Sequence, residues 1–140
     1  MSELALPLAE AADRLFAQRC DARLVAAADA GDWPQALWSS VDELGPGQLL
    51  APESVGGAGG DWLDACALLE RAAAHCAPLP IAHTLLAGWL RARVGLAPAS
   101  GPTALAFTAA PLEAMRVAGR ADVTEANGPA VPWAEQVSHV

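Results

Sequence analysis

The stretch between Trp33 and Asp64 constrains the fold of this 140-residue chain most, because it predicts two helices joined by a tight loop. Its first half places apolar side chains at helical spacing: Trp33, Leu37, Trp38, Val41 and Leu44. The Asp32 side chain is placed to accept a hydrogen bond from a free N–H of the first turn. Pro34 also lies in that turn, where the N–H that proline lacks would have had no helical partner. The glycine-proline-glycine run at 45–47 cannot extend this helix, so we expect the helix to end there.

The second half of the stretch contains four glycines and the start of another helix. The glycines, at 56, 57, 59 and 60, suit positive φ or a close approach of two backbones. Asp61 is expected to cap the following helix, and Asp64 to strengthen its positive end. A dinucleotide motif starting at Gly57 would need glycine where Trp62 stands, and no Gly-Lys-Ser/Thr of a nucleotide P-loop follows. We therefore interpret the glycines as a tight interhelix loop.

Further amphipathic helices flank this stretch. Apolar periodicity predicts them over residues 8–19, 24–30, 62–77 and 81–94. Trp89 lies on the apolar stripe of the last one and is expected in the core. After Ala97 a Pro, Ser and Gly linker precedes short strand-like segments at 103–108, 115–119 and 131–140. The predicted fold is mainly α, with a helical domain over 1–96 and a short, incomplete β segment over 97–140 that suggests a longer protein.

Composition and charge limit the classes of function. The chain is 54% apolar, and its formal charge of −8 with eight basic residues argues against a basic nucleic-acid-binding face. Three cysteines without a C-x-x-C pair, and a first segment unlike a signal peptide, predict a reduced, cytoplasmic protein. Charged residues and prolines interrupt every apolar run, so no membrane span is expected. The spacing of Cys66, His75, Cys76 and His83 does not suit zinc, and no metal site is predicted.

Several short pieces of sequence follow one another at specific spacing: Leu44-Gly45, Leu49-Leu50, Pro52-Glu53, Gly56-Gly57, Asp61, Leu69-Glu70, Pro78-Leu79-Pro80, Thr84, Gly95 and Val131-Pro132-Trp133-Ala134. In this order they resemble the N-terminal helical domain of acyl-CoA dehydrogenases. The resemblance runs from Leu8 to Val140. It implies the N-terminal helical domain and the first strands of the middle β-domain.

The resemblance also implies an activity. Such enzymes are FAD-dependent oxidoreductases that oxidise an acyl-CoA thioester, of fatty-acid or steroid side-chain metabolism, at its α and β carbons. Their catalytic base is a glutamate of the C-terminal helical bundle, and no acidic residue of this chain matches it. We therefore assign no catalytic residue here and expect the chain alone to be inactive.

Candidate binding residues follow from the same resemblance. Leu105, Phe107 and Thr108 match the family strand that contacts the flavin. Leu69, His83, Thr84 and Ala87 lie on the two helices that correspond to those flanking the acyl chain, and are the candidate substrate-binding residues. The residues at 109–111, Ala-Ala-Pro, replace the acidic-proline step of that strand.

This departure leaves a second function open. The chain could be a non-catalytic helical partner subunit of a heteromeric acyl-CoA dehydrogenase. In either case the expected partners are an acyl-CoA substrate and further copies or subunits in a homo- or hetero-oligomer, without nucleic acid or membrane.

Overall fold

The computed structural model of the chain describes residues 4–105, and this part is mainly helical. Its elements follow in the order α1 (Ala5–Arg19), α2 (Ala22–Asp29), α3 (Gln35–Asp42), α4 (Pro46–Leu49), the 3₁₀ helix η1 (Glu53–Val55), α5 (Trp62–Ala74) and α6 (Ile81–Arg93). The helices predicted from apolar periodicity are confirmed, each within a few residues of the expected ends. Of the predicted β segments, only residues 103–105 lie within the described part.

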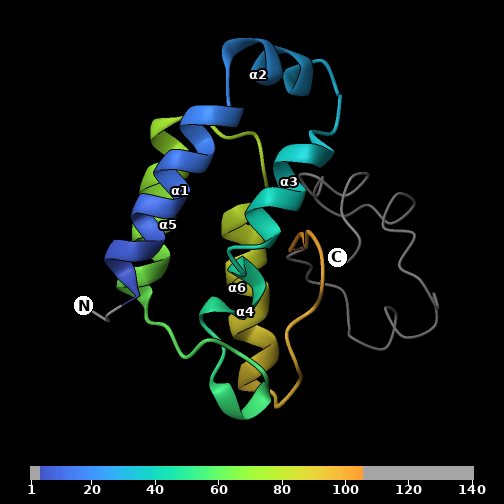
Figure 1. Cartoon of the computed structure of the whole chain (residues 1–140). Helices are drawn as coiled ribbons and strands as arrows, with labels where there is room; N and C mark the ends of the chain where they lie inside the picture. The colour runs from blue at the N-terminus through green and yellow to red at the C-terminus, as the bar shows by residue number, and fades with distance from the viewer. Residues whose placement is uncertain (1–3, 106–140) are drawn as a thin grey trace, which may run out of the picture.

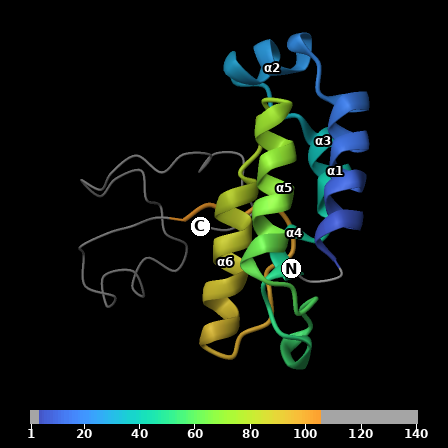
Figure 2. The ribbon, with the colours of Figure 1, turned by 90° about the vertical axis from the view of Figure 1, so that its left-hand side faces the viewer.

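The core lies where α1, α3, α5 and α6 meet. Its fully buried large side chains include Phe16 of α1, Leu37 and Val41 of α3, Leu68 of α5 and Leu85 of α6. Helices α1 and α5 lie side by side in both views (Figures 1 and 2) and make the most extensive contact between elements. Helix α2 crosses one end of this pair (Figure 1). Among residues 4–105, no helix is both long and apolar enough to span a bilayer.

The glycine loop predicted before α5 packs backbone against backbone. A Cβ at position 57 would overlap the carbonyl of Ala51, which is itself fully buried. The backbone N–H groups of Ala58, Gly59 and Gly60 donate to the carbonyls of Gln48, Ala51 and Leu49 at 2.8–2.9 Å. Because α4 ends here, no further helical turn offers N–H donors to these carbonyls. The N–H groups of the glycine loop donate to them instead.

The predicted cap of α5 is confirmed as a capping box. The Asp61 carboxylate accepts from the N–H groups of Leu63 and Asp64 at 2.8 and 3.1 Å. The buried Asp64 carboxylate accepts in return from the Asp61 N–H at 2.7 Å. Free donors of the first turn are thereby satisfied, which fixes the start of α5 at the end of the glycine loop.

The 45–47 run ends α3 as expected, and Gly45 then turns the chain with φ 69° so that Pro46 begins α4. Two local expectations were wrong. Pro34 is the N-cap of α3 and no side chain caps that helix; the Asp32 N–H instead donates to the carbonyl of Ala27 at the end of α2. Trp89 is half-buried rather than in the core, with its ring 5.6 Å from that of the exposed Trp62.

Candidate functional site

Three side chains of α6 hold the following segment against that helix. The Arg91 guanidinium donates from Nε to the carbonyl of Ala97 at 2.8 Å. Farther along, the N–H of Thr103 donates to the hydroxyl of Thr84, and the N–H of Leu105 donates to Nδ1 of His83, both at 3.2 Å. The segment thus returns along α6, as the orange trace shows (Figure 1).

Thr84 has a defined structural task. Its side chain is 2% exposed, and its hydroxyl also donates to the carbonyl of Thr103 at 3.4 Å. A buried hydroxyl without a partner would cost about 1–3 kcal/mol, so this pairing stabilises both Thr84 and the returning segment. One side chain of α6 therefore satisfies both backbone groups of Thr103.

His83 is half-buried and accepts a hydrogen bond from the N–H of Leu105, farther along the segment. Because Nδ1 accepts from the Leu105 N–H, it carries no proton in this arrangement, and a neutral ring has its proton on Nε2. The His83 side chain therefore acts as a hydrogen-bond acceptor for the backbone of the returning segment.

A small pocket lies between α6 and this segment. Its volume is about 160 Å³, and its lining is apolar except for one guanidinium and one hydroxyl: Ala87, Leu90, Arg91, Ala99, Thr103, Ala104 and Leu105. Ala87 comes from the predicted substrate-binding set and Leu105 from the predicted flavin-binding set. The fold thus brings together two residues that are 18 positions apart and that the resemblance assigned to different ligands.

The other predicted site residues do not join this pocket. Leu69 is half-buried on α5 and packs against the core, and His83 and Thr84 use their polar atoms to hold residues 103 and 105. Phe107 and Thr108 lie outside the described residues. The ligand-binding roles of all seven residues therefore stay predictions.

The pocket beside α6 does not fit a flavin by itself. Pockets for ligands of that size occupy roughly 300–1,000 Å³, well above the volume beside α6. The N–H groups of Thr103 and Leu105 and the Nε of Arg91 already donate to protein acceptors. Residues 4–105 contain no cluster of three His, Cys, Asp or Glu side chains able to hold a metal ion.

The glycine loop is not a phosphate site either. Every backbone N–H from Gly56 to Asp61 donates to an acceptor within the protein. A phosphate bound by backbone amides needs several such donors free and convergent. The loop instead stabilises the end of α4 and the start of α5.

Comparison with known proteins agrees with this architecture. The family model described as "Acyl-CoA dehydrogenase, N-terminal domain" matches residues 3–97, which include every helix of the described part. Searches of the curated proteins and of the solved structures gave no match. Since the family model covers well over half of the 140 residues, the chain belongs to the acyl-CoA dehydrogenase family and carries its N-terminal helical domain.

Proposed function

We propose that this chain is the N-terminal half of an acyl-CoA dehydrogenase-like flavoprotein and forms one wall of its acyl-CoA site. The observation that carries the proposal is the pocket on α6, because Ala87 and Leu105 line it together. In such an enzyme FAD supplies the hydride acceptor, and it would be held mainly by residues outside 4–105. The N-terminal domain assigned by the family model supports this placement.

The residues of the chain have limited tasks in this proposal. The apolar lining at Ala87, Leu90 and Leu105 would exclude water and bind methylene groups, each worth about 0.8 kcal/mol when buried. His83 and Thr84 would orient the segment that carries Leu105. The fully buried carboxylate of Asp64 is engaged in the capping box of α5, so we assign it no role as a base.

The test uses the flavoprotein assembly that contains the chain. Purified assembly should carry flavin absorbance and reduce an artificial electron acceptor when acyl-CoA thioesters are added, whereas the chain alone should not. Ala87→Leu should raise KM more for long than for short acyl chains, because it fills the pocket. Ala82→Leu, at an exposed position of the same helix, is the matched control. An assembly without flavin or without acyl-CoA-dependent reduction would refute the proposal.

A partner-subunit role is the second candidate, favoured by the Ala-Ala-Pro sequence at 109–111. In that case the assembly would contain a second, complete dehydrogenase chain, and flavin would stay with that chain after the two are separated. Mass spectrometry of the intact assembly distinguishes the two candidates.

We also propose that the chain works within a homo- or hetero-oligomer. The described part exposes several large apolar side chains: Leu4, Leu6, Trp62, Leu63, Leu90, Val94 and Leu96. Their exposure would be reduced if other parts of the flavoprotein covered them. Light scattering after size exclusion measures the mass directly, and a monomeric active enzyme would contradict the proposal.

A further inference from the structure

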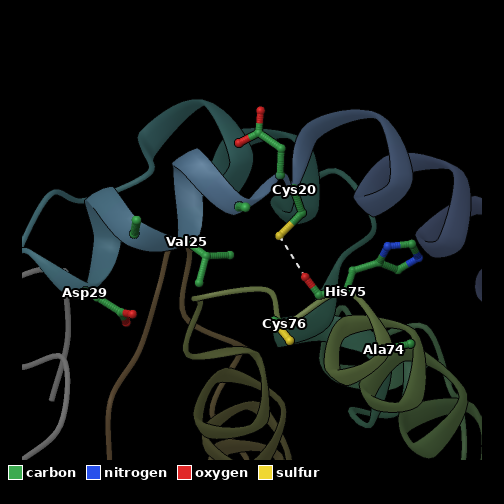
Figure 3. Close-up of a pocket in the computed structure, with 9 residues that line it drawn as sticks. Cys20, Val25, Asp29, Ala74, His75 and Cys76 are labelled. Atoms are coloured by element: carbon green, nitrogen blue, oxygen red, sulfur yellow. Dashed lines mark hydrogen bonds between the residues drawn. The ribbon is translucent and has the colours of Figure 1, made fainter.

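A second pocket, of about 480 Å³, lies where the ends of α1 and α5 meet α2 (Figure 3). Its lining includes two of the three cysteines: Cys20, Asp21, Ala22, Val25, Ala26, Asp29, Ala74, His75 and Cys76. Neither the predicted substrate-binding residues nor the predicted flavin-binding residues line it. The chemistry available here is therefore independent of the proposed acyl-CoA site.

The fold brings the two cysteines of this pocket close together. The Cys20 thiol donates to the carbonyl oxygen of His75 with Sγ and O 3.1 Å apart. Since that carbonyl is bonded directly to the nitrogen of Cys76, standard peptide geometry puts Sγ of Cys20 within about 6 Å of the Cys76 Cα. Disulfides form between residues whose Cα atoms lie about 4.4–6.8 Å apart, and the short contact from Cys20 Sγ to the His75 carbonyl makes Cys20 and Cys76 neighbours in the same pocket.

The backbone at Cys76 is a second, independent observation. Cys76 has φ 51°, a left-handed conformation that is unfavourable for a residue with a Cβ. It follows the C-cap of α5 in a Schellman motif, in which the N–H groups of Cys76 and Ala77 donate to Ala73 and Ala72. The ends of α2 and α6 have the same motif with Gly31 and Gly95 at this position. A strained residue where glycine is usual indicates a role for the side chain.

The surroundings give the two thiols different reactivities. Burial, the neighbouring Cys76 and the Asp21 carboxylate raise the pKa of the Cys20 thiol, in that order of importance. Cys76 is exposed to solvent and also lines the pocket, whereas Cys20 is half-buried. The His75 ring is 3.0 Å from the Asp13 carboxylate and so is held by α1. Cys76 is therefore the thiol that an external reagent reaches first.

We propose that Cys20 and Cys76 are a redox-active pair that closes an intramolecular disulfide on reaction with a low-molecular-weight disulfide such as oxidised glutathione. The Cys76 thiolate attacks one sulfur of the reagent, which forms a mixed disulfide and releases one small thiol. Cys20, once deprotonated, then attacks Sγ of Cys76 and releases the second small thiol. The two protein thiols lose two electrons and two protons, and the reagent gains both.

The crosslink would tie together the C-terminal ends of α1 and α5. These are the two helices in most extensive contact, and the bond would close a loop from residue 20 to residue 76 that contains every element from α2 to α5. Oxidation is expected to raise the thermal midpoint, because the crosslink restricts the unfolded chain. The thermal stability of the helical domain would then depend on the ratio of disulfide to thiol in the solution.

Peptide mapping of the full chain tests the proposal. The reduced protein is equilibrated with glutathione at several ratios of disulfide to thiol, alkylated, digested with trypsin and analysed by mass spectrometry. Cleavage after the arginines at 19, 23, 71 and 91 puts the three cysteines on separate peptides, 20–23, 24–71 and 72–91. The expected product is a linked 20–23 and 72–91 pair, with Cys66 alkylated or carrying glutathione and the protein still monomeric on a non-reducing gel.

Single variants locate the steps. Cys66→Ser should leave the linked product unchanged. Cys20→Ser should trap the mixed disulfide on Cys76, and Cys76→Ser should leave Cys20 largely unmodified. The proposal is overturned if wild-type protein carries glutathione separately on Cys20 and Cys76, if the two remain alkylated at ratios that modify Cys66, or if Cys66 is the residue that becomes linked. The wild-type map alone decides between these outcomes, whatever the folding of the variants.

Discussion

Replacing Gly88 with alanine should destabilise the helical domain more than any other single-methyl change on α6. A Cβ at position 88 would overlap the carbonyl oxygen of Gly47, so that α4 and α6 could no longer touch backbone to backbone. The obstructing atom belongs to the main chain of a short helix whose end is held by the glycine loop. No side-chain rotation relieves the overlap.

Two opposing effects determine the magnitude. Alanine is favoured over glycine in a helix interior by about 1 kcal/mol. Overpacking of a core costs about 1–3 kcal/mol, and a backbone clash belongs at or above the upper end of that range. The net loss of unfolding free energy should therefore be about 2 kcal/mol.

Urea unfolding followed by circular dichroism at 222 nm measures this loss. With a slope of roughly 1–1.5 kcal/mol/M for a domain of this size, the midpoint should fall by about 1.5 M. Gly47→Ala is the matched control, because its Cβ would meet the Ala99 carbonyl at 3.2 Å and a Thr84 methyl at 3.7 Å, which small shifts accommodate. If Gly88→Ala unfolds at the same or a higher urea concentration than wild type, α4 does not pack on α6 in this way.

Three further changes test other parts of the fold. Asp61→Ala removes the acceptor of two N–H groups and should cost about 1–2 kcal/mol in thermal unfolding; an unchanged midpoint would mean the cap does not form. Cys76→Gly should add about 0.5–1 kcal/mol, since glycine adopts φ 51° without strain, and a loss of stability would contradict this. The raised pKa of Cys20 means that the folded state binds this proton more tightly, so stability is full below the ordinary value of 9.0 and falls as pH rises past it. Cys20→Ala should remove that part of the alkaline slope, and a slope identical to wild type would refute it.

The helices could be predicted from the sequence because their signals are local. The apolar stripe from Ile81 to Val94 and the glycine after it predict α6 to within one residue of its observed end at Arg93. Likewise, the Asp61 and Asp64 carboxylates bond within their own turn, so the chemistry of four consecutive residues is enough to predict the cap.

The Asp32 expectation was wrong because a local rule competed with a neighbouring one. Asp32 has a good capping side chain, but its backbone completes the end of α2 through Gly31 and α3 begins later, after Pro34. The 45–47 run ends α3 as expected, and its proline is also suited to the first position of the next helix, so Pro46 begins α4. The apolar stripe that includes Trp89 predicts which face of α6 turns inward. It does not predict how far along α6 the core extends, so the burial of Trp89 could not be read from it.

The site depends on contacts between residues far apart in sequence, and local sequence patterns do not predict such contacts. His83 and Thr84 were candidates for the acyl pocket because the resemblance makes their helix one of the two that flank the acyl chain. In the fold, their polar atoms hold the backbone of residues 103 and 105, so a ligand could contact them only through their carbon atoms or by displacing that segment. The case for a substrate wall on α6 therefore depends on Ala87 and its apolar neighbours. It also depends on Leu105 being held in place, so in the proposed site His83 and Thr84 would position the wall rather than form part of its surface.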